Sequence, residues 1–228
     1  MIVQIYAATS IADALHMAGL GVDQIGFVAG DYSEVHAELT FSEARAMVEA
    51  LRGQATSSAL TMSTDVAEIL RMAEAVQPDI VHISSDTEAV GIAAMQHLRR
   101  ALPTGMALMK AIPVAGPESV EVALHFARVS DILLLDTKVT GLPGVGATGV
   151  SHDWNISRQI VAAVGDRAKV ILAGGLTPDN VVTAIQLVRP WGVDSNTGTN
   201  RPGDPVLKDM ERVRAFVEWA KGIVNHEA

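Results

Sequence analysis

The chain has no cysteine among its 228 residues. Disulfide bonds, zinc–thiolate sites and a thiol that acts as nucleophile or general base are therefore excluded. Aromatic residues make up only 4% of the chain, although 49% of it is hydrophobic. The core must be built from Ala, Val, Leu, Ile and Met, which is typical of helices packed on a parallel sheet.

Runs of basic residues and long apolar runs are also missing. The formal net charge is −9, so neither nucleic acid nor an anionic membrane surface is an expected partner. No apolar run approaches the roughly 18 residues of a membrane span, and the N-terminus lacks the charged flank of a signal peptide. We expect a cytoplasmic protein, either a monomer or a homodimer.

Eight short apolar runs alternate with longer amphipathic stretches. Each run is uniformly apolar, as expected of a strand that is buried on both faces. Asp65 precedes one amphipathic stretch, and Pro117 and Pro178 stand where first-turn prolines open two others. The pattern predicts a single domain over residues 1–228, a (β/α)8 TIM barrel with roughly 28 residues per unit. The predicted strands are residues 2–6, 24–28, 57–62, 80–83, 106–112, 132–135, 170–173 and 191–194.

Two glycine-containing loops follow the seventh and eighth predicted strands, where such barrels often bind a phosphate. Paired glycines between a strand and a helix let backbone N–H groups approach an anion closely. Taken alone, the glycine pair could be a tight turn, but the two loops together favour a phosphate site. We call the predicted phosphate-binding set the phosphate cup; its members are Gly174, Gly175, Asn196, Thr197 and Gly198. The glycine-rich stretch 140–149 is expected to be a mobile lid or an ordinary surface loop.

Residues 173–181 read AGGLTPDNV, which resembles the phosphate-binding stretch of the phosphoribosylanthranilate isomerase family. Further matches are GFV at 26–28, LLLDT at 133–137, GATG at 146–149 followed by Asp153-Trp154, and Lys208-Asp209. The matches span nearly the whole chain. The resemblance implies an Amadori rearrangement, in which an aminoaldose phosphate becomes an aminoketose.

Asp136 stands where the family keeps its general acid, the carboxyl that protonates the sugar ring oxygen as the ring opens. A carboxyl at a strand end beneath a lid can have its pKa raised by burial, which suits an acid that holds its proton near neutrality. The alternative is an Asp that caps its loop. Lys110, at the end of the fifth predicted strand, is expected either to steady an anionic ligand or to pair with a carboxylate.

Four departures from the family pattern concern other parts of the site. The family opens with Lys-Ile-Cys-Gly, whose cysteine is the general base, and the matching residues 4–7 read QIYA, in which Ala7 cannot accept a proton. Gln-Leu-His-Gly in the fourth strand has become HISS at 82–85. The arginine that binds the anthranilate carboxylate is absent from SEVHAE at 33–38, and Ser-Gly-Val-Glu has become TGTN at 197–200.

His82 is the first candidate for a replacement base, because strand alternation aims it or Ser84 into the barrel mouth and imidazole titrates near neutrality. A structural hydrogen bonder is the alternative. Asp31, Glu34 and Asp194 are further candidates, whereas His36 and His152 only share the same end of the barrel. No cluster of His and carboxylates has metal-ligand spacing, so we expect no metal and no cofactor.

These observations leave three hypotheses. The one that the departures favour is an isomerase of this type acting on a phosphorylated sugar derivative other than phosphoribosylanthranilate. The second is the family reaction itself, that of tryptophan biosynthesis, run with a replacement base. The third is a non-catalytic protein that binds a phosphorylated metabolite. Fold alone does not decide among them.

Overall fold

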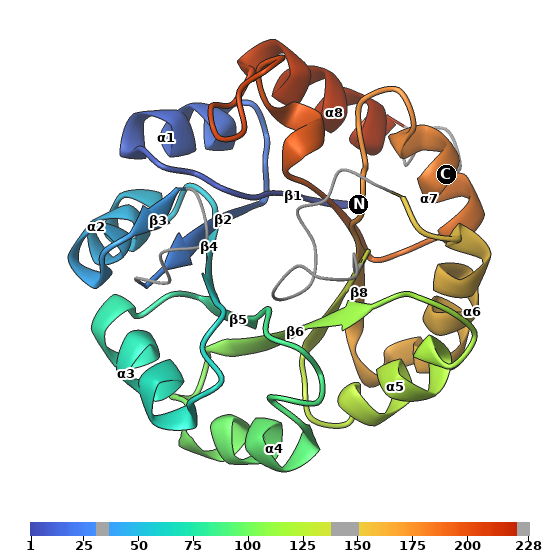
Figure 1. The fold of residues 1–228 in the computed structure, drawn as a ribbon. Coiled ribbons are helices and arrows are strands. Elements are labelled where there is room, and N and C mark those ends of the chain that lie inside the picture. Colours follow the sequence, from blue (N-terminus) through green and yellow to red (C-terminus); the bar gives the residue numbers. More distant parts are fainter. Residues whose placement is uncertain (31–36, 138–150, 223–228) are drawn as a thin grey trace.

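The computed structural model describes residues 1–30, 37–137 and 151–222. In these residues eight parallel strands form a closed ring, and helices surround the ring (Figure 1). The strand order is β1-β9-β8-β7-β6-β5-β4-β2, and pairing between β1 and β2 closes it. The predicted (β/α)8 barrel is confirmed.

The barrel strands are β1 (Ile2–Ile5), β2 (Gln24–Ala29), β4 (Thr56–Thr61), β5 (Ile80–Ile83), β6 (Ala107–Pro113), β7 (Ile132–Asp136), β8 (Lys169–Leu172) and β9 (Gly192–Ser195). The surrounding helices are α1 (Ile11–Gly19), α2 (Phe41–Leu51), α3 (Val66–Val76), α4 (Ile92–Ala101), α5 (Ser119–Phe126), α6 (Trp154–Val164), α7 (Val181–Val188) and α8 (Met210–Gly222). A two-residue strand, β3 (Glu38–Leu39), pairs with the end of β2 and was not predicted.

Alternation along each strand separates two hydrophobic cores. In β7, Leu133 and Leu135 belong to the large core that also contains the helix residues, whereas Ile132 and Leu134 belong to a small core inside the barrel. Because successive side chains point to opposite faces, Asp136 continues the inward-facing row of β7. The same alternation aims His82 of β5 inward, two residues after inward-facing Ile80.

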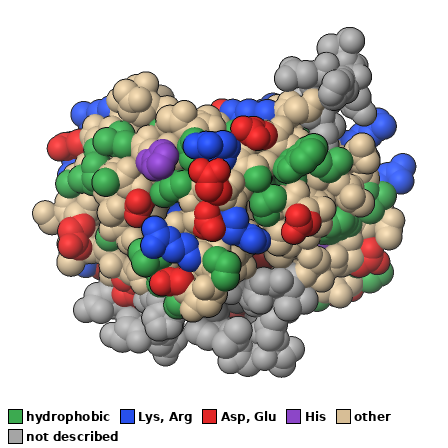
Figure 2. Space-filling view, turned by 90° about the horizontal axis from the view of Figure 1, so that it is seen from above, with side chains coloured by type: hydrophobic (Ala, Val, Ile, Leu, Met, Phe, Trp, Pro, Cys, Tyr) green, Lys and Arg blue, Asp and Glu red, His purple; other side chains and the backbone are tan. Residues whose placement is uncertain are grey.

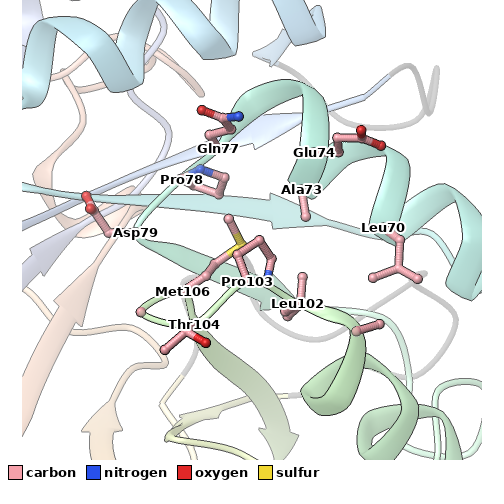
Figure 3. A pocket seen from close by; sticks show the side chains of 12 residues that line it. Leu70, Ala73, Glu74, Gln77, Pro78, Asp79, Leu102, Pro103, Thr104 and Met106 are labelled. Atoms are coloured by element: carbon pink, nitrogen blue, oxygen red, sulfur yellow. The ribbon is translucent and has the colours of Figure 1, made fainter.

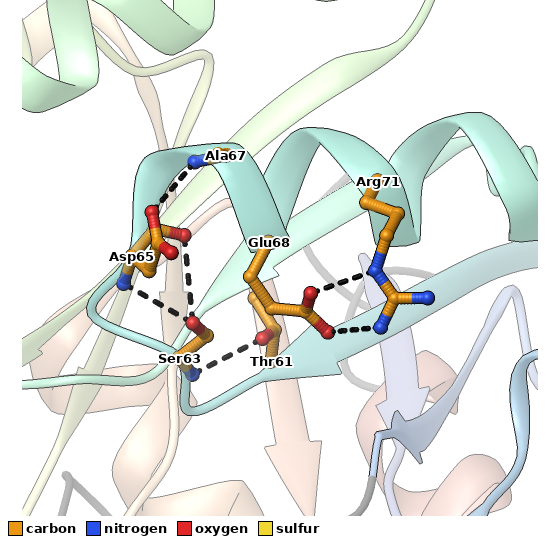
Figure 4. Close-up of polar contacts among 6 residues, drawn as sticks. All are labelled: Thr61, Ser63, Asp65, Ala67, Glu68 and Arg71. Atoms are coloured by element: carbon orange, nitrogen blue, oxygen red, sulfur yellow. Dashed lines mark hydrogen bonds and ion pairs between the residues drawn. The ribbon is translucent and has the colours of Figure 1, made fainter.

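The start of α3 shows how side chains fix a helix end (Figure 4). Asp65 is the N-cap residue, and its carboxylate accepts a hydrogen bond from the Ala67 N–H at 2.9 Å. The Asp65 N–H donates to the Ser63 hydroxyl oxygen at 3.1 Å. A cap of this kind satisfies one of the N–H groups that the first helical turn leaves without a partner. The predicted helix start at Asp65 is confirmed.

Replacing Asp65 by alanine is expected to lower the free energy of unfolding by about 1 kcal/mol, because the Ala67 N–H loses its acceptor. Chemical denaturation at neutral pH measures the change. Glu74→Ala is the matched control: it removes an exposed carboxylate from the same helix, away from the first turn, and should change stability by less than about 0.5 kcal/mol. Equal effects of the two substitutions would contradict the capping role.

One flank of the barrel carries the exposed large hydrophobic side chains. Among the described residues these are Ile11 and Leu15 of α1, Trp219 of α8 and Leu207, which precedes α8. Figure 2 looks onto the flank where α1 and α8 lie and shows hydrophobic side chains separated by both acidic and basic side chains. The mixed charge gives this flank no basic patch. Monomer or homodimer stays an open prediction.

Candidate active site at the C-terminal end of the barrel

Asp136 is the last residue of β7 and lies at the barrel mouth. Its side chain is almost completely buried, with 8% of the residue exposed. Its Oδ1 accepts a hydrogen bond from the Thr137 N–H at 2.6 Å. Burial raises the pKa of Asp136 to about 7, and the Thr137 N–H only partly opposes this rise. A carboxyl of this kind holds its proton near neutral pH, as a general acid must.

Asp194 is a second buried carboxyl at the same end. β9 pairs with β1 in a register that sets Asp194 beside Gln4, and the Gln4 amide Nε2 donates to Asp194 Oδ1 at 3.0 Å. Burial is the main cause that raises the pKa of Asp194, and the charge of Asp136 adds to it. The Gln4 hydrogen bond and Lys208 lower the pKa, and the net value is about 8. The two carboxyls therefore influence each other's protonation.

The paired glycines bring the loop after β8 directly against Asp136. Gly174 and Gly175 have φ of +81° and +67°, the left-handed region that glycine adopts at no steric cost. A Cβ on Gly174 would lie 2.7 Å from Thr137 Oγ1 and 3.3 Å from Asp136 Oδ1. Neither glycine N–H donates a backbone hydrogen bond in the described part of the chain. Two N–H groups without a backbone acceptor among the described residues therefore lie in the loop that adjoins Asp136.

The loop after β9 packs against the loop after β8. Ser195 Oγ donates to the Leu176 carbonyl oxygen at 2.8 Å. A Cβ on Gly198 would lie 2.0 Å from the same oxygen, so only glycine lets the two loops approach this closely. A short 3-10 helix, Thr197–Thr199, lies at this place, and Asn196 is its N-cap residue. The structure therefore brings together the two halves of the predicted phosphate cup.

Lys208 braces the second half of the cup, a role that the sequence did not suggest. Its ammonium donates to the Asn196 carbonyl and side-chain oxygens, both at 2.9 Å, and to Asn200 Oδ1 at 2.6 Å. Only 4% of the residue is exposed, and burial lowers its pKa to about 7 against the opposing effect of Asp194. Asn200 stands where the family pattern has a glutamate. That departure was the available signal, because it leaves a buried lysine with neutral partners.

His82 faces the barrel interior, but Tyr6 holds it. Tyr6 follows β1, and its hydroxyl lies 2.5 Å from His82 Nδ1 and 2.8 Å from Ser58 Oγ. The tyrosine ring fills the space above Gly26, where a Cβ would lie 2.4 Å from the ring carbons. Burial lowers the pKa of His82 to about 3 and raises that of Tyr6 well above its usual value. The hydrogen bond with Tyr6 and the lowered pKa make His82 a poor proton acceptor. This argues against its predicted role as a base and favours the alternative, a structural hydrogen bonder.

The backbone at Ala7 revises the comparison with the family's Lys-Ile-Cys-Gly stretch. Ala7 has a φ of +66°, in the region that favours glycine. Ala7 thus occupies the glycine position, and the residue that takes the place of the base cysteine is Tyr6. The prediction that the family's base is lost at Ala7 is therefore corrected: the base position is that of Tyr6, and the chain has no cysteine.

Lys110 does not reach the barrel mouth. Lys110 lies on the same face of β6 as Leu108 and Ile112, which pack against the helices. Met109 lies on the other face, toward the barrel interior. The Lys110 ammonium donates to the carbonyl oxygens of Ile83 and Ser85 and lies 5.9 Å from the ring centroid of Phe126 in α5. The side chain is fully buried between barrel and helices. The position of Lys110 does not support binding of an anionic ligand in the barrel mouth. It agrees better with the alternative, a neighbouring carboxylate, because burial lowers the pKa of Lys110 and the charge of Asp86 raises it against this lowering.

His152 lies at the same end of the barrel, as predicted. Its Nδ1 lies 3.1 Å from Thr137 Oγ1, and its Nε2 lies 2.6 Å from Ser157 Oγ. Burial lowers its pKa to about 4. Asp31, Glu34, His36 and the stretch 140–149 fall outside the described ranges. Among the residues that the structure describes, no group of three or more His, Asp or Glu side chains is arranged to hold a metal ion.

A cavity of about 600 Å³ lies at the opposite end of the barrel. Pro78, Asp79, Pro103 and Met106, at the ends of α3 and α4 and before β5 and β6, line it (Figure 3). In barrels of this type the reaction takes place at the C-terminal ends of the strands, and the N-terminal face contributes to stability. This cavity is therefore not the site of Asp136 and Asp194.

In the described part of the chain, no helix is long and apolar enough to cross a membrane.

Buried carboxyls beside two glycine-containing loops, at the C-terminal face of a (β/α)8 barrel, are the arrangement of a barrel enzyme. A model of the N-(5′-phosphoribosyl)anthranilate (PRA) isomerase family matches residues 3–219. The chain is 34% identical over 219 residues to N-(5′-phosphoribosyl)anthranilate isomerase of Haloferax volcanii, covering 96% of this chain and 92% of the relative. The chain belongs to the PRA isomerase family.

Two solved structures agree with this assignment. The monomers generated from the dimeric enzyme of Thermotoga maritima superpose with a TM-score of 0.76 at 26% identity, covering 97% of this chain and 100% of that one. A PRA isomerase in complex with reduced 1-(o-carboxyphenylamino)-1-deoxyribulose 5-phosphate gives the same score, identity and coverage. That relative thus binds a phosphorylated ligand.

Proposed function

We propose that this protein catalyses the Amadori rearrangement of N-(5′-phosphoribosyl)anthranilate, the family reaction of tryptophan biosynthesis. The family match over residues 3–219 carries the proposal. It favours the family reaction over the changed substrate that the sequence departures had suggested, and over a protein that only binds ligand. The reaction needs no cofactor in this proposal.

In this proposal, the role of each site residue follows from where it lies at the barrel mouth. The phosphate is bound by the N–H groups of Gly174 and Gly175 and by the loop of Asn196, Thr197 and Gly198. Asp136 adjoins the glycines and donates its proton to the ring oxygen, so that the C1–O bond breaks as the amine lone pair forms the C=N bond. The buried position keeps the acid protonated.

The test is turnover of PRA by the purified wild-type chain, followed by chromatography of substrate and product. Calorimetry with the reduced product analogue measures binding separately. Turnover together with tight binding supports the proposal. If the analogue fails to bind while another sugar phosphate binds, the substrate has changed. If the analogue binds without turnover, the protein is a binder and the proposal is wrong.

A further inference from the structure

The proposed reaction needs a base at C2, and the family's cysteine is replaced by Tyr6. We propose that the carboxylate of Asp194 takes the C2 proton, so that Asp194 and Asp136 form the base and acid of one carboxyl pair. The inference rests on the proposed function and names the group that the departures at the family's base left open.

Position is the first argument for Asp194. It lies on β9 next to β1, the strand that precedes the family's base position, in register with Gln4. Gln4 Nε2 holds one carboxylate oxygen, Oδ1, at 3.0 Å. The other oxygen, Oδ2, makes no hydrogen bond with the described residues. One oxygen is thus oriented by the barrel wall while the other is left to accept a proton.

The charges around Asp194 are the second argument. The ionised form is favoured by the Gln4 amide and by the ammonium of Lys208, and disfavoured by Asp136. The negative charge of Asp194 also raises the pKa of Tyr6, which directly follows the neighbouring strand β1. Because each carboxylate disfavours ionisation of the other, the pair keeps one proton over a range of pH. Burial raises the pKa of both carboxyls, so the pair retains a proton near neutral pH.

The other groups near the base position are fixed in neutral form. The Tyr6 hydroxyl is engaged by His82 and Ser58, and burial opposes both a tyrosinate and an imidazolium there. A proton taken by this pair would create a buried imidazolium, which burial and the charge of Lys110 both disfavour. Asp194 needs only to become a neutral carboxyl, which burial favours.

The proton and electron changes balance over the two steps. Asp136 protonates the ring oxygen, the C1–O bond breaks, and the nitrogen lone pair forms the C=N bond. Asp194 then removes the proton from C2, and the C2–H electrons form the C1=C2 bond while the C=N electrons return to nitrogen. The enolamine becomes the aminoketose. Asp194 ends protonated and Asp136 ionised, and proton exchange with solvent resets the pair.

The test compares Asp194→Asn with the wild type on PRA carrying hydrogen or deuterium at C2. Asparagine keeps the Oδ1 acceptor for Gln4, so the fold should survive. We expect kcat to fall about 10²- to 10⁴-fold, with an increased deuterium isotope effect because C2 proton removal becomes rate-limiting. Binding of the reduced product analogue should stay within about threefold. The low-pH limb of the kcat/KM profile, on which the base must lose its proton, should disappear.

Two further variants test whether the loss of activity comes from the missing carboxylate. Asp194→Ala should lose the same activity and regain part of it when formate is added. Asp166→Asn, which alters an exposed carboxyl in the turn before β8, should behave as wild type. If Asp194→Asn keeps kcat within tenfold, Asp194 is not the base although the proposed function stands. If the wild type itself does not turn over PRA, the proposed function fails, and the inference fails with it.

Discussion

Asp136→Asn is expected to lower kcat for PRA by about 10²- to 10⁴-fold, because the amide cannot protonate the ring oxygen as the sugar opens. The C2 deuterium isotope effect should vanish in this variant, since ring opening then limits the rate. Asp131→Asn is the matched control, because Asp131 precedes the same strand at its other end, where it accepts from Leu108 N at 2.8 Å. That control should keep kcat within threefold.

Asp136→Asn should lower kcat, but it should raise stability relative to the wild type as the pH increases. The pKa of Asp136 is raised in the folded protein to about 7 from a usual value of 3.8, so the folded state binds more protons than the unfolded chain between these pH values. The stability that this group contributes therefore falls as pH rises from about 4 to 7. Asparagine stays neutral, and Tm of the variant minus Tm of the wild type should rise over that range. A pH-independent difference would contradict the buried-acid description.

If Asp136→Asn keeps kcat within tenfold of the wild type, Asp136 is not the acid. If neither protein turns over PRA and both bind the analogue equally, the non-catalytic hypothesis replaces the enzyme. The isotope effect separates the two carboxyls, because loss of the acid suppresses it and loss of the base increases it. Measurements on Asp136→Asn and Asp194→Asn therefore assign the roles independently of any resemblance.

The sequence predicts the barrel because its strands are short apolar runs in a repeating unit, and each run matches one observed barrel strand. It also predicts that Asp136 lies at the site, because the residue directly follows a strand and stands where the family resemblance places the general acid. The loop glycines follow for a similar reason. Positive φ at Gly174 and close approach at Gly198 are requirements that only glycine meets, and glycine is visible in a sequence.

The errors came from strands that are apolar on both faces. β6 carries Leu108 and Met109 in succession, so its pattern does not tell which face Lys110 occupies; the packing of α5 decides it. The Tyr6 contact with His82 joins residues 76 positions apart, and it depends on the empty space at Gly26. Neither spacing nor composition reports such a contact. Lys208 was missed because its partners lie in an irregular loop.

Gly198→Ala is expected to separate the two halves of the phosphate cup. The new Cβ would lie 2.0 Å from the Leu176 carbonyl oxygen and 2.9 Å from its carbon; these are backbone atoms that cannot rotate away. The loops must move apart and lose the Ser195 hydrogen bond to Leu176. Overpacking of this kind costs about 1–3 kcal/mol, and Tm falls by about 2–4 °C for each kcal/mol in a chain of this size.

Affinity separates this effect from a general loss of stability. Calorimetry at a temperature where the variant is folded should show that the reduced product analogue binds at least tenfold more weakly, because the N–H groups of the two loops no longer converge on its phosphate. Gly19→Ala is the control: nothing lies within 4 Å of that Cβ, and alanine at the end of α1 should preserve both Tm and affinity. Unchanged affinity in Gly198→Ala would mean that the two loops pack together without binding the phosphate, and the ligand site would then have to be sought elsewhere on the C-terminal face.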